Sequence, residues 1–258
     1  MTSSTKPTIL LIQGSFQLPE IYSKLVTALE ARGYPVAHPV LPSTTGHDEP
    51  DFASRSLVDD ALTVQRQVEQ LVEQEGKIVV ALMHSYGGLV GTEGIPRELS
   101  WEARKQHGQP GGVLHLFFFS AFVFAEGQSI IGLLGEAPNT VVKPNGRFTM
   151  ENAGRLIYND LPAEEAAYWE SKIIDQSYAV QTTELTRAAY RYIPSTYAIC
   201  ELDQALSLNI QEKFAEAADA DVIRLNAGHS PMLSIPEELA DLIAAASEGA
   251  LKRTGLAV

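Results

Sequence analysis

The chain has 258 residues, a length that one large domain with a well-buried core accounts for. Asp and Glu number 32 against 19 Lys and Arg, so the net charge of −13 repels nucleic-acid phosphates and anionic lipid headgroups, and neither is expected as a partner. Cys200 is the only cysteine, which excludes an internal disulfide and a thiolate metal cluster and suits a reducing compartment.

The two most apolar parts of the sequence are too short to target or anchor the chain. Thr8–Ile12 follows the amino terminus directly, and it is shorter than the hydrophobic region of a signal peptide and has no cleavage site after it. Val113–Ala125 is interrupted by His115 and Ser120, and it falls short of the roughly 18 residues of a membrane-spanning helix. We therefore expect a soluble protein of the cytoplasm, with no membrane partner.

Short apolar runs alternate with amphipathic segments along most of the chain. The runs are nearly all continuous, which is typical of strands covered on both faces. The predicted strands are Thr8–Gln13, Pro35–Pro39, Lys77–Met83, Val113–Ser120, Ser195–Cys200 and Asp221–Leu225. The predicted helices are Pro19–Arg32, Ser56–Glu75, Leu206–Ala217 and Pro236–Ala250. This alternation predicts an α/β fold, with a mostly parallel sheet and helices on both faces.

One long segment, residues 122–194, breaks the alternation. It has few strand signals, several aromatic residues and helix-like stretches such as Pro162–Trp169. An insertion of this size between two core strands predicts a helical cap over the carboxyl edge of the sheet, where open parallel sheets bind ligands. We expect a single domain over residues 1–258, with its core at 8–121 and 195–250 and its cap at 122–194.

The segment Lys77–Gly88, KIVVALMHSYGG, predicts a strand that turns abruptly into a helix. Small residues at such a turn hold a serine in a strained, exposed position, so Ser85 is the candidate nucleophile. The amide of Tyr86 would then face a developing oxyanion at the start of the helix. Met83 occupies the place of the first glycine in the Gly-x-Ser-x-Gly pattern, which puts a bulky side chain between strand and helix.

A second element follows the first predicted strand. Gly14 allows the amide of Ser15 to turn toward Ser85, which would supply a second donor to a tetrahedral intermediate. Taken alone, a Gly-Ser pair after a strand is most often only a turn.

The third element is a histidine in a glycine-containing loop after the last predicted strand. Of the six histidines, His229 alone has this position, downstream of the serine element, and it is the candidate base. His84 is expected to pack inside the sheet. The others are too dispersed for zinc ligands, and no metal is expected; they are His38, His47, His107 and His115.

The acid that orients the histidine is expected in the loop after Ser195–Cys200, where Glu201 and Asp203 are both available. Asp203 is preferred because it lies farther beyond the strand, whereas Glu201 is close enough to the strand end to face away. The alternative is that Asp203 only caps the following helix before Gln204.

The order Ser85, Asp203, His229 resembles that of the α/β-hydrolase superfamily. The chain is most similar to its compact esterase-like branch, which includes plant methylesterases, hydroxynitrile lyases and fungal and bacterial homologues. The segments that carry the resemblance are Ile9–Ser15, Gly33–Pro42, His84–Gly88, Phe119–Phe122, Pro194–Tyr197 with Asp203, and Gly228–Pro231. It implies Ser85 as nucleophile, His229 as base, Asp203 as its orienting acid, the Ser15 and Tyr86 amides as oxyanion hole, and no cofactor.

Two positions depart from the family pattern. Gln13 stands where the family usually has a histidine before the glycine, which is expected to alter hydrogen bonding beneath the oxyanion hole. Ser230 follows His229, where plant-type hydroxynitrile lyases have a lysine that stabilises cyanide. Cyanogenic chemistry is therefore disfavoured.

The leading hypothesis is a serine hydrolase that cleaves an ester, lactone or thioester of a small to medium apolar or aromatic molecule through an acyl-enzyme on Ser85. The expected pocket residues are Phe16, Phe122, Trp169 and Met232. One alternative is a carbon–carbon bond hydrolase or lyase of retro-aldol type that acts on a polyketide-like substrate. The other is a small-molecule receptor that retains the three residues. The oligomeric state is left open.

Overall fold

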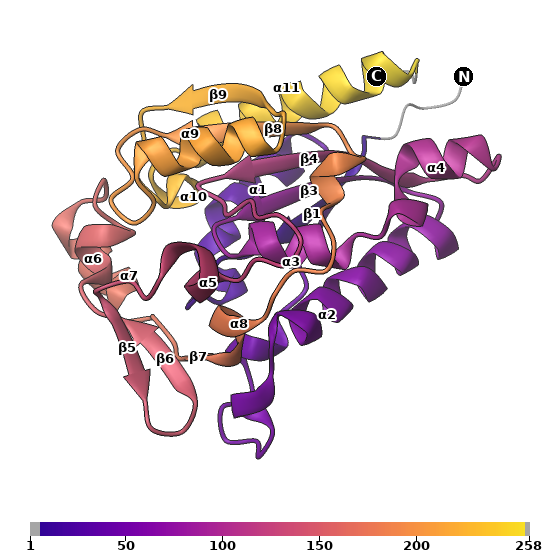
Figure 1. The fold of residues 1–258 in the computed structure, drawn as a ribbon. Helices are drawn as coiled ribbons and strands as arrows, with labels where there is room; N and C mark the ends of the chain where they lie inside the picture. Colours follow the sequence, from indigo (N-terminus) through magenta and orange to yellow (C-terminus); the bar gives the residue numbers. More distant parts are fainter. Residues whose placement is uncertain (1–5, 256–258) are drawn as a thin grey trace.

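A six-stranded parallel sheet lies at the centre of the computed structural model, which describes residues 6–255 (Figure 1). Its strands lie in the order β2-β1-β3-β4-β8-β9, and every neighbouring pair is parallel. The bounds are Thr8–Ile12 (β1), Val36–Ala37 (β2), Ile78–His84 (β3), Gly112–Phe119 (β4), Ser195–Cys200 (β8) and Asp221–Leu225 (β9). The six predicted strands are thus confirmed, with small shifts of their ends.

Helices cover both faces of this sheet, as the sequence predicts (Figure 1). Alternate side chains of each strand point to opposite faces. In β1, Leu10 and Ile12 join one hydrophobic core, whereas Ile9 and Leu11 join the other. The first core is closed by α2 (Leu57–Glu69), α3 (Gly87–Gly94) and α9 (Leu208–Ala217). The second is closed by α1 (Ser23–Ala31), α10 (Pro231–Ser234) and α11 (Pro236–Thr254).

Local sequence signals set the ends of the long helices. Ser56 and Asp59 form a reciprocal capping box that starts α2, and a π-helical turn, Gln70–Gln74, ends this segment. Gly255, with φ of 75°, ends α11. The remaining core helix is α4, Trp101–Gln106. Short 3-10 turns lie at Pro19–Tyr22, Pro42–Thr44, Phe52–Ser54, Arg97–Leu99 and Ala189–Arg191.

The cap is only partly helical, which corrects the sequence prediction for residues 122–194. It holds the short helices α5 (Ile130–Leu134), α6 (Ala153–Leu156), α7 (Ala163–Glu170) and α8 (Ala179–Thr182). It also holds an antiparallel sheet of β5 (Thr140–Lys143), β6 (Arg147–Met150) and β7 (Gln176–Ser177). Gly146, with φ of 71°, lies in the hairpin turn between β5 and β6. In Figure 1 the hairpin of β5 and β6 lies on the opposite side of the molecule from α4.

Among the described residues, no helix is both long and apolar enough to cross a membrane.

The methionine that replaces glycine before the Ser85 turn is accommodated by a glycine in the facing helix. Met83 pairs with Ile12 in the neighbouring strand and is fully buried. A Cβ atom added to Gly91 of α3 would lie 2.4 Å from the Met83 sulfur and 2.8 Å from Cδ1 of Ile12. Gly91 of α3, which has no side chain, therefore provides the space for Met83 that a glycine in the strand would have made unnecessary.

We expect Gly91→Ala to lower the free energy of unfolding by about 1–3 kcal/mol, because the added methyl group overpacks this contact. The penalty should become smaller in a Met83→Ala background, where the sulfur is gone and the contact with Ile12 remains. The control is Gly249→Ala in α11, where the nearest atom is 3.8 Å away and a gain of about 0.5–1 kcal/mol is expected from helix propensity. Urea denaturation of the single and double variants measures the coupling, and additive effects of the two changes would contradict this account.

Candidate active site

Ser85 lies on a strained turn between β3 and α3. Its φ is 51°, a left-handed conformation that non-glycine residues rarely adopt. The following glycines permit a close approach of backbones: a Cβ atom at Gly87 would lie 2.2 Å from the Ile12 carbonyl oxygen, and one at Gly88 would lie 2.1 Å from that of Phe122. The turn therefore presents the serine at the carboxyl end of β3 against two neighbouring chain segments.

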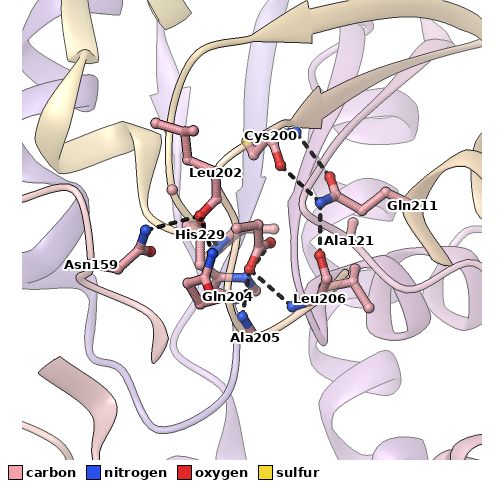
Figure 2. A network of polar contacts seen from close by, with 12 residues as sticks. Ala121, Asn159, Cys200, Leu202, Gln204, Ala205, Leu206, Gln211 and His229 are labelled. Atoms are coloured by element: carbon pink, nitrogen blue, oxygen red, sulfur yellow. Dashed lines mark hydrogen bonds and ion pairs between the residues drawn. The ribbon is translucent and has the colours of Figure 1, made fainter. Parts of the chain in front are cut away.

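Asp203 and His229 are brought together from the turns that follow β8 and β9. Nδ1 of His229 donates a hydrogen bond of 2.8 Å to Oδ2 of Asp203, and both side chains are buried. The other carboxylate oxygen, Oδ1, accepts the amides of Ala205 and Leu206, which lie beside His229 in Figure 2. Asp203 thus holds the imidazole and also caps a turn, so the alternative that it only caps the following helix is wrong; α9 begins later, at Leu208.

The other carboxylate considered for this role points away. Glu201 is exposed, and its Oε1 lies 3.3 Å from Nη1 of Arg224. Because Nδ1 of His229 is taken up by Asp203, Nε2 is the ring nitrogen left to face other groups.

Ser85 and His229 line the same cavity of about 340 Å³. Ser15 and Phe16 also line it, as does Phe122. Among the described residues, the amides of Ser15 and Tyr86 have no hydrogen-bond acceptor, so both are free to bind an anionic oxygen. The predicted serine and histidine and two of the predicted pocket residues, Phe16 and Phe122, therefore line one cavity.

Two residues expected in this pocket lie elsewhere. Met232 of α10 is fully buried in the core beneath the sheet, because the helix that starts at Pro231 turns its side chain toward α1 and α11. Trp169 of α7 lines a neighbouring hollow with Tyr158 and Lys172 instead. The cap residues that do line the cavity come mainly from α5, the hairpin of β5 and β6, and the segment 135–139 between them; they include Ile130, Leu134, Thr140, Phe148 and Met150.

A buried chain of hydrogen bonds connects the segments that carry the site. Nε2 of His84 donates to the His229 carbonyl oxygen over 2.9 Å, so its Nδ1 accepts from the Tyr22 hydroxyl, 2.8 Å away. The Tyr22 oxygen accepts in turn the amide of Gly14, 2.9 Å away. Burial, and then the nearby His229, hold the pKa of His84 well below its usual value. His84 is thus a buried neutral histidine, as expected, and it also bridges the two loops.

Gln13 ties the loop before Ser15 to itself. Its Nε2 donates to the Gln17 carbonyl oxygen over 2.5 Å, and its Oε1 is buried without a partner among the described residues. The loop that carries the Ser15 amide is therefore closed by a glutamine amide, in the place where the family resemblance leads one to expect histidine.

A second buried network lies under the Ser85 turn. The Tyr86 hydroxyl donates to Oδ2 of Asp60 over 2.8 Å, and the amide and hydroxyl of Ser43 donate to the same carboxylate. Gln176 of the cap strand β7 donates to the Ser43 hydroxyl over 2.9 Å. Burial raises the pKa of Asp60 to about 6, although these hydrogen bonds oppose the shift.

Tyr22 and Asp60 were not identified from the sequence. Each is a polar side chain on a predicted helix, and its partner lies far along the chain at a separation that no local pattern reveals. A buried position on the apolar stripe of its helix was the one available signal.

Few charged groups face the cavity. Glu136, which is exposed, is the one acidic side chain among its lining residues, and no Lys or Arg lines it. In the part of the chain that the structure describes, no cluster of three His, Cys, Asp or Glu side chains is placed to hold a metal ion. The site thus offers hydrogen-bond donors and an imidazole in largely apolar walls.

We expect Asp60→Asn to gain stability relative to the unmodified protein as pH rises from 4 to 7. The folded carboxyl keeps its proton up to about pH 6, whereas the unfolded one releases it near its ordinary pKa of 3.8, so deprotonation favours unfolding in this window by up to about 3 kcal/mol. An asparagine amide loses this dependence, and its oxygen can still accept from the two hydroxyls. Urea unfolding at each pH measures the difference.

The control for this experiment is Asp241→Asn. Arg32 lowers the pKa of Asp241, so the charged carboxylate stabilises the fold above its ordinary pKa, and its removal should cost stability as pH rises. A flat difference between Asp60→Asn and the unmodified protein, or a difference of the same sign as for Asp241→Asn, would contradict the role given to Asp60.

Sequence comparison finds relatives along nearly the whole chain. The model of a family described as the alpha/beta hydrolase family matches residues 9–242. A probable hydrolase, R7, from a Phoma species is 29% identical over 250 residues, which cover 93% of this chain and 98% of that protein. A pyrethroid hydrolase from Sphingobium wenxiniae is 30% identical over 256 residues, or 92% of this chain and 86% of that protein.

Solved structures show the same fold at lower sequence identity. A pyrethroid hydrolase from Sphingobium faniae superposes with a TM-score of 0.70 at 23% identity and covers 94% of this chain and 97% of its own. A methylesterase from Arabidopsis superposes with a TM-score of 0.72 at 17% identity and covers 94% of this chain and 99% of its own. The order and direction of the central strands are thus those of known hydrolase structures.

Proposed function

This chain belongs to the alpha/beta hydrolase family, and we propose that it is a serine hydrolase that cleaves a carboxylic ester, lactone or thioester through an acyl-enzyme on Ser85. The observation that carries the proposal is the buried Asp203–His229 hydrogen bond of 2.8 Å at a cavity that Ser85 also lines. A serine on a strained turn and an oriented imidazole at the same cavity are the groups that nucleophilic acyl transfer requires.

The first half of the reaction forms the acyl-enzyme. Oγ of Ser85 attacks the carbonyl carbon while Nε2 of His229 takes its proton, and Asp203 stabilises the imidazolium that results. The free amides of Ser15 and Tyr86 bind the negative oxygen of the tetrahedral intermediate. The intermediate then expels the alcohol or thiol, which leaves with the proton that His229 returns.

The second half releases the acid. A water molecule gives a proton to Nε2 of His229 as its oxygen attacks the acyl carbon, and the same amides bind the new oxyanion. When the intermediate collapses, Ser85 regains its proton from His229 and the carboxylic acid departs. No group beyond the three side chains, the two amides and water takes part, so the proposal includes no cofactor.

The cavity supports a neutral, small to medium apolar or aromatic substrate. Its walls are formed by aliphatic and aromatic side chains with a few amides, and its volume of about 340 Å³ is that of a small-molecule pocket. The relatives named as pyrethroid hydrolase and methylesterase support ester chemistry on this scaffold. The proposal extends ester chemistry to the present chain, but it does not extend the individual substrates of these relatives.

Incubation with a fluorophosphonate should attach one adduct to Ser85, because phosphonylation needs an activated serine. Intact mass and peptide mapping detect it, and Ser85→Ala should carry none while it keeps its melting temperature. His229→Gln should label at least about 100-fold more slowly, since it removes the base. A folded protein with no adduct would contradict the acyl-enzyme and favour carbon–carbon cleavage or ligand binding. Undiminished ester hydrolysis by Ser85→Ala would also contradict an acyl-enzyme on Ser85.

Neutral esters should be preferred to anionic ones of the same shape. Methyl 4-carbamoylbenzoate and monomethyl terephthalate form a matched pair, and we expect kcat/KM to be at least about 10-fold lower for the second, because its carboxylate would be buried without a cation. Glu136→Gln should narrow the ratio only in part, since it removes a repulsion but adds no positive charge. Equal rates for the two esters would show that the apolar walls do not select the substrate.

A further inference from the structure

Two adjacent cap residues hold the backbone next to both members of the Asp203–His229 pair. Asn159 and Asp160 lie between α6 and α7. Nδ2 of Asn159 donates to the carbonyl oxygen of Leu202 over 2.8 Å, a contact drawn in Figure 2. Oδ2 of Asp160 accepts the amide of Gly228 over 2.7 Å. The cap therefore binds the loops after β8 and β9 by hydrogen bonds, each at the residue that directly precedes Asp203 or His229.

The two loops are also joined to each other where the cap touches them. The amide of Leu202 donates to the Ala227 carbonyl oxygen over 3.0 Å, and that of Glu201 donates to the Leu225 carbonyl oxygen over 2.9 Å. A shift of one loop is therefore transmitted to the other. Asn159 and Asp160 contact the end of this ladder that lies next to the catalytic pair.

The fit at Gly228 is so close that any side chain there would displace Asn159 and Asp160. A Cβ atom there would lie 2.6 Å from Oδ1 of Asn159 and 2.6 Å from Oδ1 of Asp160. Both of these oxygens are buried, and neither has a hydrogen-bond partner among the described residues. The two side chains thus form hydrogen bonds with the loops and none with the cap itself. Burial of an unpaired carboxylate oxygen costs folding free energy.

We infer that Asp160, with Asn159 beside it, is a positioning residue through which the cap sets the geometry of the Asp203–His229 pair. The inference rests on the proposed function, because it assigns the contact a role in activating Ser85. When the cap is seated, the Gly228 amide is fixed, and the imidazole that follows it is held in line with Asp203. When the cap moves away, both loops lose a partner, so chemistry is coupled to closure of the cap over the substrate.

The test compares Asp160→Ala, Asp160→Asn and Thr186→Val with the unmodified protein. Asparagine keeps an oxygen that can accept the Gly228 amide, whereas alanine leaves that amide without a partner. Thr186 lies at the other end of the cap, where its hydroxyl donates to Glu93 over 2.5 Å and its amide donates to the same carboxylate. Thr186→Val therefore removes one cap hydrogen bond away from the backbone beside His229, and the amide bond to Glu93 keeps the cap in place. Melting temperatures, kcat, KM for a p-nitrophenyl ester and the rate constant of fluorophosphonate labelling are measured for all four proteins.

We expect Asp160→Ala to lower kcat and the labelling rate constant roughly 10- to 100-fold with KM changed less than about twofold, as for a misplaced catalytic group. Asp160→Asn and Thr186→Val should stay within about threefold of the unmodified protein in both rates, even where their melting temperatures fall. Equal losses in Asp160→Ala and Asp160→Asn would assign the effect to charge and overturn the inference. So would equal losses in Asp160→Ala and Thr186→Val, or no loss in Asp160→Ala. A lack of labelling in the unmodified protein would instead contradict the proposed function itself.

Discussion

The site depends on one buried, neutral histidine that donates with one ring nitrogen and accepts with the other. Because burial keeps His84 neutral, its one N–H donates to the His229 carbonyl oxygen, and its other ring nitrogen accepts from the Tyr22 hydroxyl. Its ring also stacks on Phe119 at 4.7 Å, which fixes its plane. Because the Tyr22 oxygen also accepts the Gly14 amide, hydrogen bonds through the His84 ring connect the loop that carries the free Ser15 amide to the loop that carries His229. Both are then held against the turn that presents Ser85.

The sequence predicted the parts of the fold that follow from local pattern. Continuous apolar runs give parallel strands, and parallel strands bring their carboxyl ends to one edge, so this pattern together with the serine and histidine motifs predicted Ser85, Asp203 and His229 at the same edge. The cap could not be predicted in this way. Its hairpin strands are short and partly polar, and their side chains show no regular alternation of buried and exposed positions. Met232 illustrates the same limit: it directly follows the candidate loop, yet a short helix turns it into the core.

The contacts that complete the site join residues far apart in the sequence. Tyr22 meets His84 across 62 residues, Asp60 meets Tyr86 across 26, and Asp160 meets Gly228 across 68. None of them belongs to a motif, because a buried polar group needs a partner in space and not at a fixed spacing. Their positions on apolar helix faces or in a polar cap would have drawn attention to them only once the packing was known.

The cap contacts the candidate site from two sides, so in the proposed mechanism its placement contributes to the geometry of the reacting groups. On one side Gln176 of β7 reaches the Ser43–Asp60–Tyr86 network below the turn that carries Ser85. On the other, Asp160 reaches the amide before His229. In the proposed mechanism, Tyr86 supplies an oxyanion donor and His229 is the base, so the cap would help to position both. A substrate that packs against the apolar walls of the cavity would then align both groups at once, and the proposed selection by the cap would act on the reaction rate as well as on binding.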